Sequence, residues 1–224
     1  MDSLTELIIG ENDYLDILPY HIGIEIECDT EEEYIDKYLN HIPCLETRNS
    51  TGELRIKFDT GINGLCQLYC FTLFLNKYSS FNEGSGIHYN IDTSINDLYV
   101  NRNNVDEVSL ILGELETWNY KGTYNSKCVR NKVQWCAIRK NRLEIRIGEM
   151  SFDFNFILNR IQSCNKIVDG LLELKGKQRI VEEDYQFDDI KKYLDYIDLL
   201  DNFIGVRKEE EKVYKNKTIN YYDI

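Results

Sequence analysis

The segment His21–Cys28, with the sequence HIGIEIEC, places Glu25 and Glu27 two residues apart in an otherwise apolar run. Apolar residues alternate with them, and this period of two is typical of a β-strand whose successive side chains point to opposite faces of a sheet. A carboxylate is costly to bury unless something pairs with it. The segment therefore predicts a strand that is apolar on one face, with two carboxylates on the other that need partners.

Three later segments show the same alternation. They are ELRIKF at 53–58, GIHYNID at 86–92 and RLEIRI at 142–147. The apolar residues of all four segments would meet the helices, and the polar residues would share the other face of the sheet. The polar residues of the later three segments are Glu53, Arg55, Lys57, His88, Asn90, Asp92, Arg142, Glu144 and Arg146.

Apolar residues at helical spacing predict helices at about 30–39, 62–78, 104–119, 153–175 and 188–203. Thr30 and Glu33 have the spacing of a capping box at the start of the first helix. Asp153 is expected to cap the fourth helix, which should stop near Gly176. The strands and helices together predict an α+β fold in which the helices at 62–78, 104–119 and 153–175 cover one face of an antiparallel sheet.

The chain has 224 residues and a formal net charge of -13 at pH 7. This charge argues against non-specific binding to nucleic acid or to anionic membranes. The longest apolar stretch, residues 65–75, is shorter than the roughly 20 residues that span a bilayer, so it favours a buried helix. No Gly/Ser-rich linker or repeat divides the chain, and we expect one domain over 1–206 followed by a polar tail over 207–224. The seven scattered cysteines and the lack of a visible signal peptide favour a reducing cytoplasm.

The polar face of the predicted sheet has two interpretations. One is an ordinary solvated face, whose exposed charge pairs contribute well under about 1 kcal/mol each. The other is a binding site, because carboxylates and a histidine on rigid strands suit Mg²⁺ or Mn²⁺. Arginines beside them suit phosphate or carboxylate, which they bind in bidentate fashion. Metal and arginine together are typical of phosphoryl transfer.

Four motifs, in order, resemble those of the glutamine synthetase superfamily of carboxylate–amine ligases, in particular its small amidoligases. They are GIEIE at 23–27, the isolated Glu53, GSGIH at 84–88 and RLEIR at 142–146. The resemblance extends from about His21 to Ile167 and implies a concave metal- and nucleotide-binding site on the open face of the sheet. It also implies ATP as a substrate: ATP phosphorylates a carboxylate, and an amine then displaces phosphate to leave an amide.

The resemblance also implies roles for single residues. The metal ligands would be Glu25, Glu27, Glu53, His88 and Glu144. Arg146 would face the transferred phosphate and, with Glu53, act in catalysis. Nucleotide or substrate contacts would come from Arg55, Gly86, Asn90 and Arg142. Asn90 stands where relatives often carry a second histidine, although its amide can still form hydrogen bonds.

Two further features remain open at the level of sequence. Glu46 is either one more metal ligand or a turn residue, and Lys127, Arg130 and Lys132 either contact phosphate or belong to a solvated edge strand. The favoured function is an ATP-dependent ligase that acts on small-molecule or peptide carboxylates and amines. The alternatives are a ligase fold that has lost turnover and serves in a larger assembly, and a metal-dependent phosphotransferase with another acceptor.

Overall fold

A six-stranded antiparallel sheet forms the centre of the computed structural model, with strand order β3-β4-β1-β6-β8-β7. The structure describes residues 18–43, 45–50, 53–81, 85–94, 96–101, 103–118, 136–139, 142–180 and 191–200. The strands of the sheet are β1 (Ile22–Glu27), β3 (Glu46–Ser50), β4 (Glu53–Phe58), β6 (Ile87–Asp92), β7 (Cys136–Arg139) and β8 (Arg142–Gly148). A separate two-stranded ladder pairs β2 (Asp29–Thr30) with β5 (Ser79–Ser80). The four strands predicted from alternation are therefore confirmed as β1, β4, β6 and β8.

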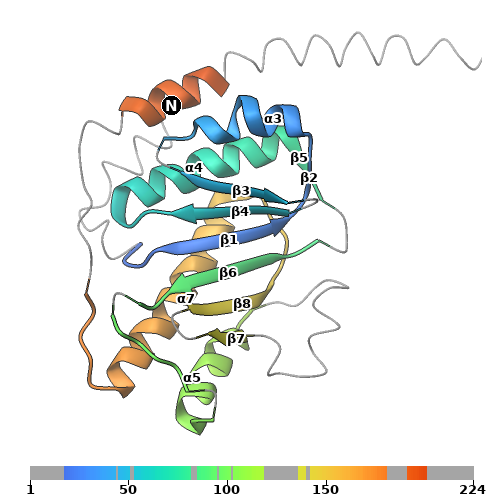
Figure 1. The fold of residues 1–224 in the computed structure, drawn as a ribbon. Coiled ribbons are helices and arrows are strands. Elements are labelled where there is room, and N and C mark those ends of the chain that lie inside the picture. The colour runs from blue at the N-terminus through green and yellow to red at the C-terminus, as the bar shows by residue number, and fades with distance from the viewer. Residues whose placement is uncertain are drawn as a thin grey trace, which may run out of the picture.

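The helices are α3 (Glu32–Lys37), α4 (Gly61–Tyr78), α5 (Val105–Leu115) and α7 (Phe154–Leu174), with a short 3₁₀ helix at Leu39–His41. Residues 191–200 are also helical. In Figure 1, α7 runs behind the strands of the sheet. It packs against β6 and α4, α4 packs against β4, and α5 packs against α7. The fold is therefore α+β, with the long helices gathered on one face of an antiparallel sheet.

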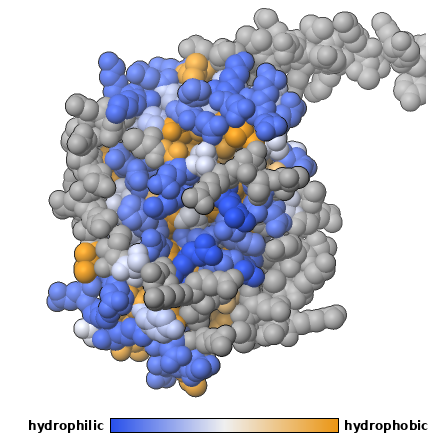
Figure 2. Space-filling model, viewed as in Figure 1, coloured by the Kyte–Doolittle hydropathy of each residue, from blue (hydrophilic) through white to orange (hydrophobic). Residues whose placement is uncertain are grey.

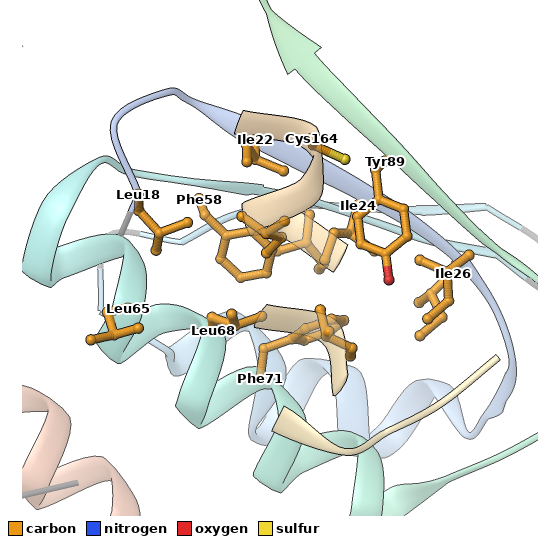
Figure 3. Close-up of a cluster of buried hydrophobic side chains, with 14 of the residues drawn as sticks. Leu18, Ile22, Ile24, Ile26, Phe58, Leu65, Leu68, Phe71, Tyr89 and Cys164 are labelled. Atoms are coloured by element: carbon orange, nitrogen blue, oxygen red, sulfur yellow. The ribbon is translucent and has the colours of Figure 1, made fainter. Parts of the chain in front are cut away.

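The hydrophobic core lies between this face of the sheet and the helices. The apolar residues of β1, namely Ile22, Ile24 and Ile26, are fully buried. Figure 3 shows them beside Phe58 of β4, Tyr89 of β6 and side chains of α4 that include Leu68 and Phe71. Because the side chains of a strand alternate between faces, burying these residues turns Glu25 and Glu27 to the opposite face. Figure 2 shows hydrophilic residues gathered over the face of the sheet turned to the viewer.

The ends of the helices test the capping predictions. Asp153 caps α7 as predicted, with its carboxylate accepting from the Phe156 backbone N–H at 2.7 Å, and Gly176 follows the helix with a φ of 61°. The capping box at Thr30 is wrong: Thr30 belongs to β2, and its hydroxyl lies 2.7 Å from that of Ser79. Its side chain is used in the β2–β5 ladder, so α3 begins without a side-chain cap.

Two helix ends also differ from the prediction. The first helix ends at Lys37 and gives way to the 3₁₀ turn, and α5 ends at Leu115, before the predicted 119. Within the described residues, 191–200 of the predicted 188–203 helix are helical. Of the helices in the described part of the chain, none has both the length and the apolar composition to cross a membrane. The predicted tail at 207–224 lies outside the described residues.

Candidate metal centre and adjoining pocket

Three side chains from three adjacent strands meet on the polar face of the sheet. Glu25 of β1, His88 of β6 and Glu144 of β8 each offer one ligand atom, and these atoms lie within 4.8 Å of one another. His88 Nδ1 and Glu25 Oε2 are 3.6 Å apart. Two carboxylates and an imidazole form a donor set that suits Mg²⁺ or Mn²⁺. We call these residues the Glu25–His88–Glu144 cluster.

The pairing of the strands explains why these residues meet. Glu25 lies opposite Arg55 on β4 and opposite His88 on β6, so the central strand brings the first two members together. The pairing of β6 with β8 shifts register between Ile87 and Tyr89, on either side of His88. Such an irregularity bends a strand and re-aims a side chain, and it is common next to functional sites. Glu144 joins the cluster from a diagonal position, because its direct register partner on β6 is Asn90 rather than His88.

Glu144 is buried, and two arginines compensate its charge. The residue is 4% exposed. Arg146 Nε donates to Glu144 Oε1 at 2.6 Å, and Arg142 Nη2 donates to Oε2 at 3.4 Å. Both arginines are two residues from Glu144 on β8 and so share its face of the sheet. Breaking a buried ion pair is costly because it leaves an uncompensated charge, which makes these pairs part of the local structure. The Arg146 side chain is nevertheless 39% exposed.

A pocket of about 440 Å³ opens over the same face, beside the cluster. The predicted residues Glu25, Arg55, Asn90 and Arg142 line it. Its charged residues are three carboxylates and three cations: Glu25, Glu46, Asp92, Arg55, Lys57 and Arg142. The hydrogen bond from Arg55 to Glu53 and the nearby Glu25 raise the pKa of Arg55, which keeps this guanidinium charged. The face therefore combines candidate metal ligands with cations that can bind an oxyanion.

Other predicted site residues lie near the cluster but outside it. Glu27 faces Glu53 in the register of β1 and β4, and neither belongs to the group of ligand atoms within 4.8 Å. Glu53 accepts from Arg55 at 3.2 Å and lines a second pocket, with Lys77 and Ser80 among its other residues. The Gly86 carbonyl accepts from the Glu27 backbone N–H at 3.1 Å, so it continues the pairing of β1 and β6. The structure thus brings together three of the five predicted metal ligands.

Some residues of the pocket were not singled out from the sequence. Gly23, Lys57 and Asp92 line the pocket. The alternation in their strands places them on the polar face, so they could have been predicted from the sequence as neighbours of the site. Glu46 belongs to β3 and also lines the pocket, so it is not a turn residue. Burial raises the pKa of the Cys136 thiol to about 12. Lys127, Arg130 and Lys132 lie outside the described residues.

No family model, curated protein or solved structure matches this chain. The resemblance to the glutamine synthetase superfamily therefore rests on the four sequence motifs and stays a prediction. This resemblance does not assign an activity to the chain, so a function has to be inferred from the side chains on the polar face of the sheet.

Proposed function

We propose that this chain is an ATP-dependent carboxylate–amine ligase with a glutamine synthetase-like core that works with Mg²⁺ or Mn²⁺ in the cytoplasm. The observation that carries the proposal is the Glu25–His88–Glu144 cluster beside a pocket that is also lined by Arg55 and Arg142. Metal ligands and arginines on one face are what phosphoryl transfer requires, because its catalysis depends on positioning and on neutralising charge.

The proposed roles follow from the contacts. Glu25, His88 and Glu144 would hold the divalent cation, which when bound neutralises charge on the phosphates. A substrate carboxylate attacks the γ-phosphorus of ATP and releases ADP, and an amine then displaces phosphate from the acyl phosphate. Arg146, whose side chain is part-exposed and adjoins Glu144, would neutralise the transferred phosphoryl group. Because one carboxylate contacts both Arg142 and Arg146, it would place two cations next to the metal.

The second candidate is a ligase fold that has lost turnover and serves as a binding or structural component. The 2.6 Å bond from Arg146 to Glu144 favours it, because the arginine already has a carboxylate partner within the protein. Asn90 at the position of the expected second histidine also favours it. The partial exposure of the Arg146 side chain favours the ligase, since a side chain that contacts a substrate must be accessible from solvent. Turnover separates the two candidates.

The test is phosphate release from ATP by the purified protein with Mg²⁺, in the presence and absence of a pool of carboxylates and amines. We expect slow hydrolysis that the pool accelerates. Arg146→Ala should lower the rate by about 10²-fold or more, as expected for loss of one contact to the transition state. Arg179→Ala is the matched control, because Arg179 pairs with Asp169 of α7, and it should leave the rate unchanged. Failure of millimolar ATP with Mg²⁺ to bind in calorimetry would favour the candidate without turnover.

A further inference from the structure

The end of β6 and the residues that follow it form one part of the pocket wall. Asp92 and Ser94 both line the pocket. Asp92 Oδ1 accepts from the backbone N–H of Ser94 at 2.8 Å and from its hydroxyl at 2.5 Å. The Asp92 backbone N–H donates to the carbonyl of His21, another residue of the pocket, at 3.0 Å. The place of these side chains in the wall therefore depends on how the chain after β6 is held.

The turn after β6 contains a residue in an unfavourable conformation. We call residues 93, 94 and 96–98 the β6 turn. Within it, the backbone N–H of Leu98 donates to the Thr93 carbonyl at 3.0 Å. Asp97 has a φ of 45°, and among the described residues it is the only one other than glycine with a positive φ. A side chain with a Cβ disfavours this left-handed conformation, so other contacts are needed to stabilise it.

Two such contacts come from the segment that follows α7. We call residues 176–180 the strap. Lys177 Nζ donates to the backbone carbonyl of Asp97 and lies 3.2 Å from its carboxylate. The Ile180 backbone N–H donates to Asn96 Oδ1 at 2.6 Å, and Asn96 is only 5% exposed. In Figure 1 the green connection from β6 to α5 and the orange end of α7 both lie at the lower left.

The strap is attached to a rigid element. Gly176 has a φ of 61°, and the Lys177 backbone N–H donates to the Leu172 carbonyl at 2.9 Å, which is a common way for a helix to end. The helix that ends here, α7, has 21 residues and packs against β6 and α4. The Asp97 carboxylate is almost fully exposed, so its charge pair with Lys177 contributes little. The bonds to the Asp97 carbonyl and to the buried Asn96 amide are therefore the ones that hold the turn.

We propose that the strap positions this part of the pocket wall, with Lys177 and Asn96 as the positioning residues. By holding the β6 turn against the end of α7, they keep Asp92 and Ser94 in place in the wall. Loss of either contact loosens the turn and, with it, the wall. The inference rests on the proposed function only for the expectation that ATP with Mg²⁺ is the ligand whose binding suffers. The coupling of the strap to the wall can be measured without a ligand.

The test is amide hydrogen exchange of the full chain, followed by NMR in the wild type, in Lys177→Met and in Asn96→Ala. The backbone N–H of Leu98 reports on the turn, and that of Asp92 reports on the wall. Loss of one hydrogen bond should make both amides exchange about two- to tenfold faster, because the turn opens locally more often. The Ile157 backbone N–H, in the first turn of α7, should exchange as in the wild type.

Two further variants separate positioning from general effects. Lys166→Met is the matched control, because it removes an exposed lysine from α7 itself, and both amides should exchange at the wild-type rate. Lys177→Arg keeps a long cationic donor and should restore most of the protection of Asp92. Unchanged exchange at Asp92 in Lys177→Met and Asn96→Ala would overturn the proposal, even if Leu98 exchanged faster. Equal acceleration at Asp92 and Ile157 would overturn it too, since that would show a loss of global stability.

Calorimetry with ATP and Mg²⁺ connects this inference to the proposed function. Lys177→Met and Asn96→Ala should each raise the Kd about two- to tenfold, and Lys166→Met should leave it unchanged. An unchanged Kd in variants whose Asp92 amide exchanges faster would overturn the positioning role.

The two proposals can fail separately. Faster exchange at Asp92 in Lys177→Met, in a protein that does not bind ATP, would leave the strap standing and remove the ligase. ATP turnover together with unchanged exchange at Asp92 would overturn the strap and leave the ligase.

Discussion

Replacement of Glu25 by glutamine tests the candidate metal centre directly, and Glu27→Gln is its matched control. The two glutamates lie on the same strand and the same face, two residues apart. Only Glu25 belongs to the group of ligand atoms within 4.8 Å, together with His88 and Glu144. Each substitution removes one carboxylate charge and keeps nearly the same shape. A general effect of net charge on stability would therefore appear in both variants, whereas loss of a metal ligand would appear in one.

The expected rise in Tm on metal binding follows from the thermodynamic linkage between binding and folding. At a metal concentration 100 times the Kd, binding to the folded state alone raises the free energy of unfolding by about 2.7 kcal/mol. For a chain of this length, about 1 kcal/mol shifts the Tm by roughly 2–4 °C, so Mg²⁺ or Mn²⁺ should raise the wild-type Tm by roughly 5–10 °C. If loss of one of three ligands weakens binding about 100-fold, the same concentration stabilises Glu25→Gln by only about 0.4 kcal/mol, or about 1 °C.

The measurement is a thermal melt of each protein with and without the cation, with Ca²⁺ and added NaCl as comparisons. Glu27→Gln should retain most of the wild-type rise, because its side chain is outside the cluster. Equal rises in the two variants would show that the ion binds elsewhere. A loss confined to Glu27→Gln would show that the metal centre lies towards Glu53, at the other end of β1.

Three further predictions concern stability, each measured by denaturant unfolding. Glu107→Ala should destabilise by about 1–3 kcal/mol, because it removes a buried carboxylate that accepts from the Asn101 backbone N–H at 2.7 Å and from Lys175 Nζ at 2.8 Å. Burial raises the pKa of the Cys66 thiol from 9.0 to about 12. The contribution of the neutral thiol to the free energy of unfolding should therefore be fully present below pH 9 and should fall by about 1.4 kcal/mol per pH unit between pH 9 and 12. Cys66→Ala should remove this part of the pH dependence. Gly64→Ala should destabilise strongly, since its Cβ would lie 2.0 Å from a backbone oxygen, whereas Gly113→Ala should stabilise by up to about 1 kcal/mol; equal effects of the two would contradict the packing around α4.

The sequence predicted which residues share a face, because alternation in a strand needs no knowledge of its neighbours. It predicted the four strands that carry the polar residues and the caps of α7 on the same local grounds. β3 was missed because ETRNS at 46–50 has no apolar alternation, and it is a strand only through its pairing with β4. β2 and β5 are two residues each, which is too short to leave a periodic signal. Thr30 was misassigned for this reason.

The alternation in a strand predicts which face a residue lies on, but it does not predict which residues of neighbouring strands lie opposite one another. Glu25 and Glu27 are equivalent by alternation, but they are about 6–7 Å apart along an extended strand. Which of them meets His88 depends on strand order and on the register of β1 with β6, in which Glu25 lies opposite His88. These are set by the pairing of segments that lie far apart in the chain. The resemblance to a family supplied candidate ligands, and the structure selects three of them as a group.

The burial of the polar face bears on the two interpretations that the sequence left open. An ordinary solvated face consists of exposed pairs, and the Arg55–Glu53 pair is of this kind, with 52% of the arginine side chain exposed. The Glu25–His88–Glu144 cluster is different, since its side chains are 17%, 12% and 5% exposed. Two carboxylates and an imidazole that are largely withdrawn from water cost free energy unless charge or hydrogen bonds compensate them. Arg142 and Arg146 compensate the charge of Glu144. The groups near the Glu25 carboxylate are His88, whose Nδ1 is 3.6 Å away, and Arg55, which interacts with it electrostatically. A divalent cation would remove this imbalance, and for that reason Glu25, rather than Glu144, is the residue whose replacement separates a metal centre from a structural ion-pair network.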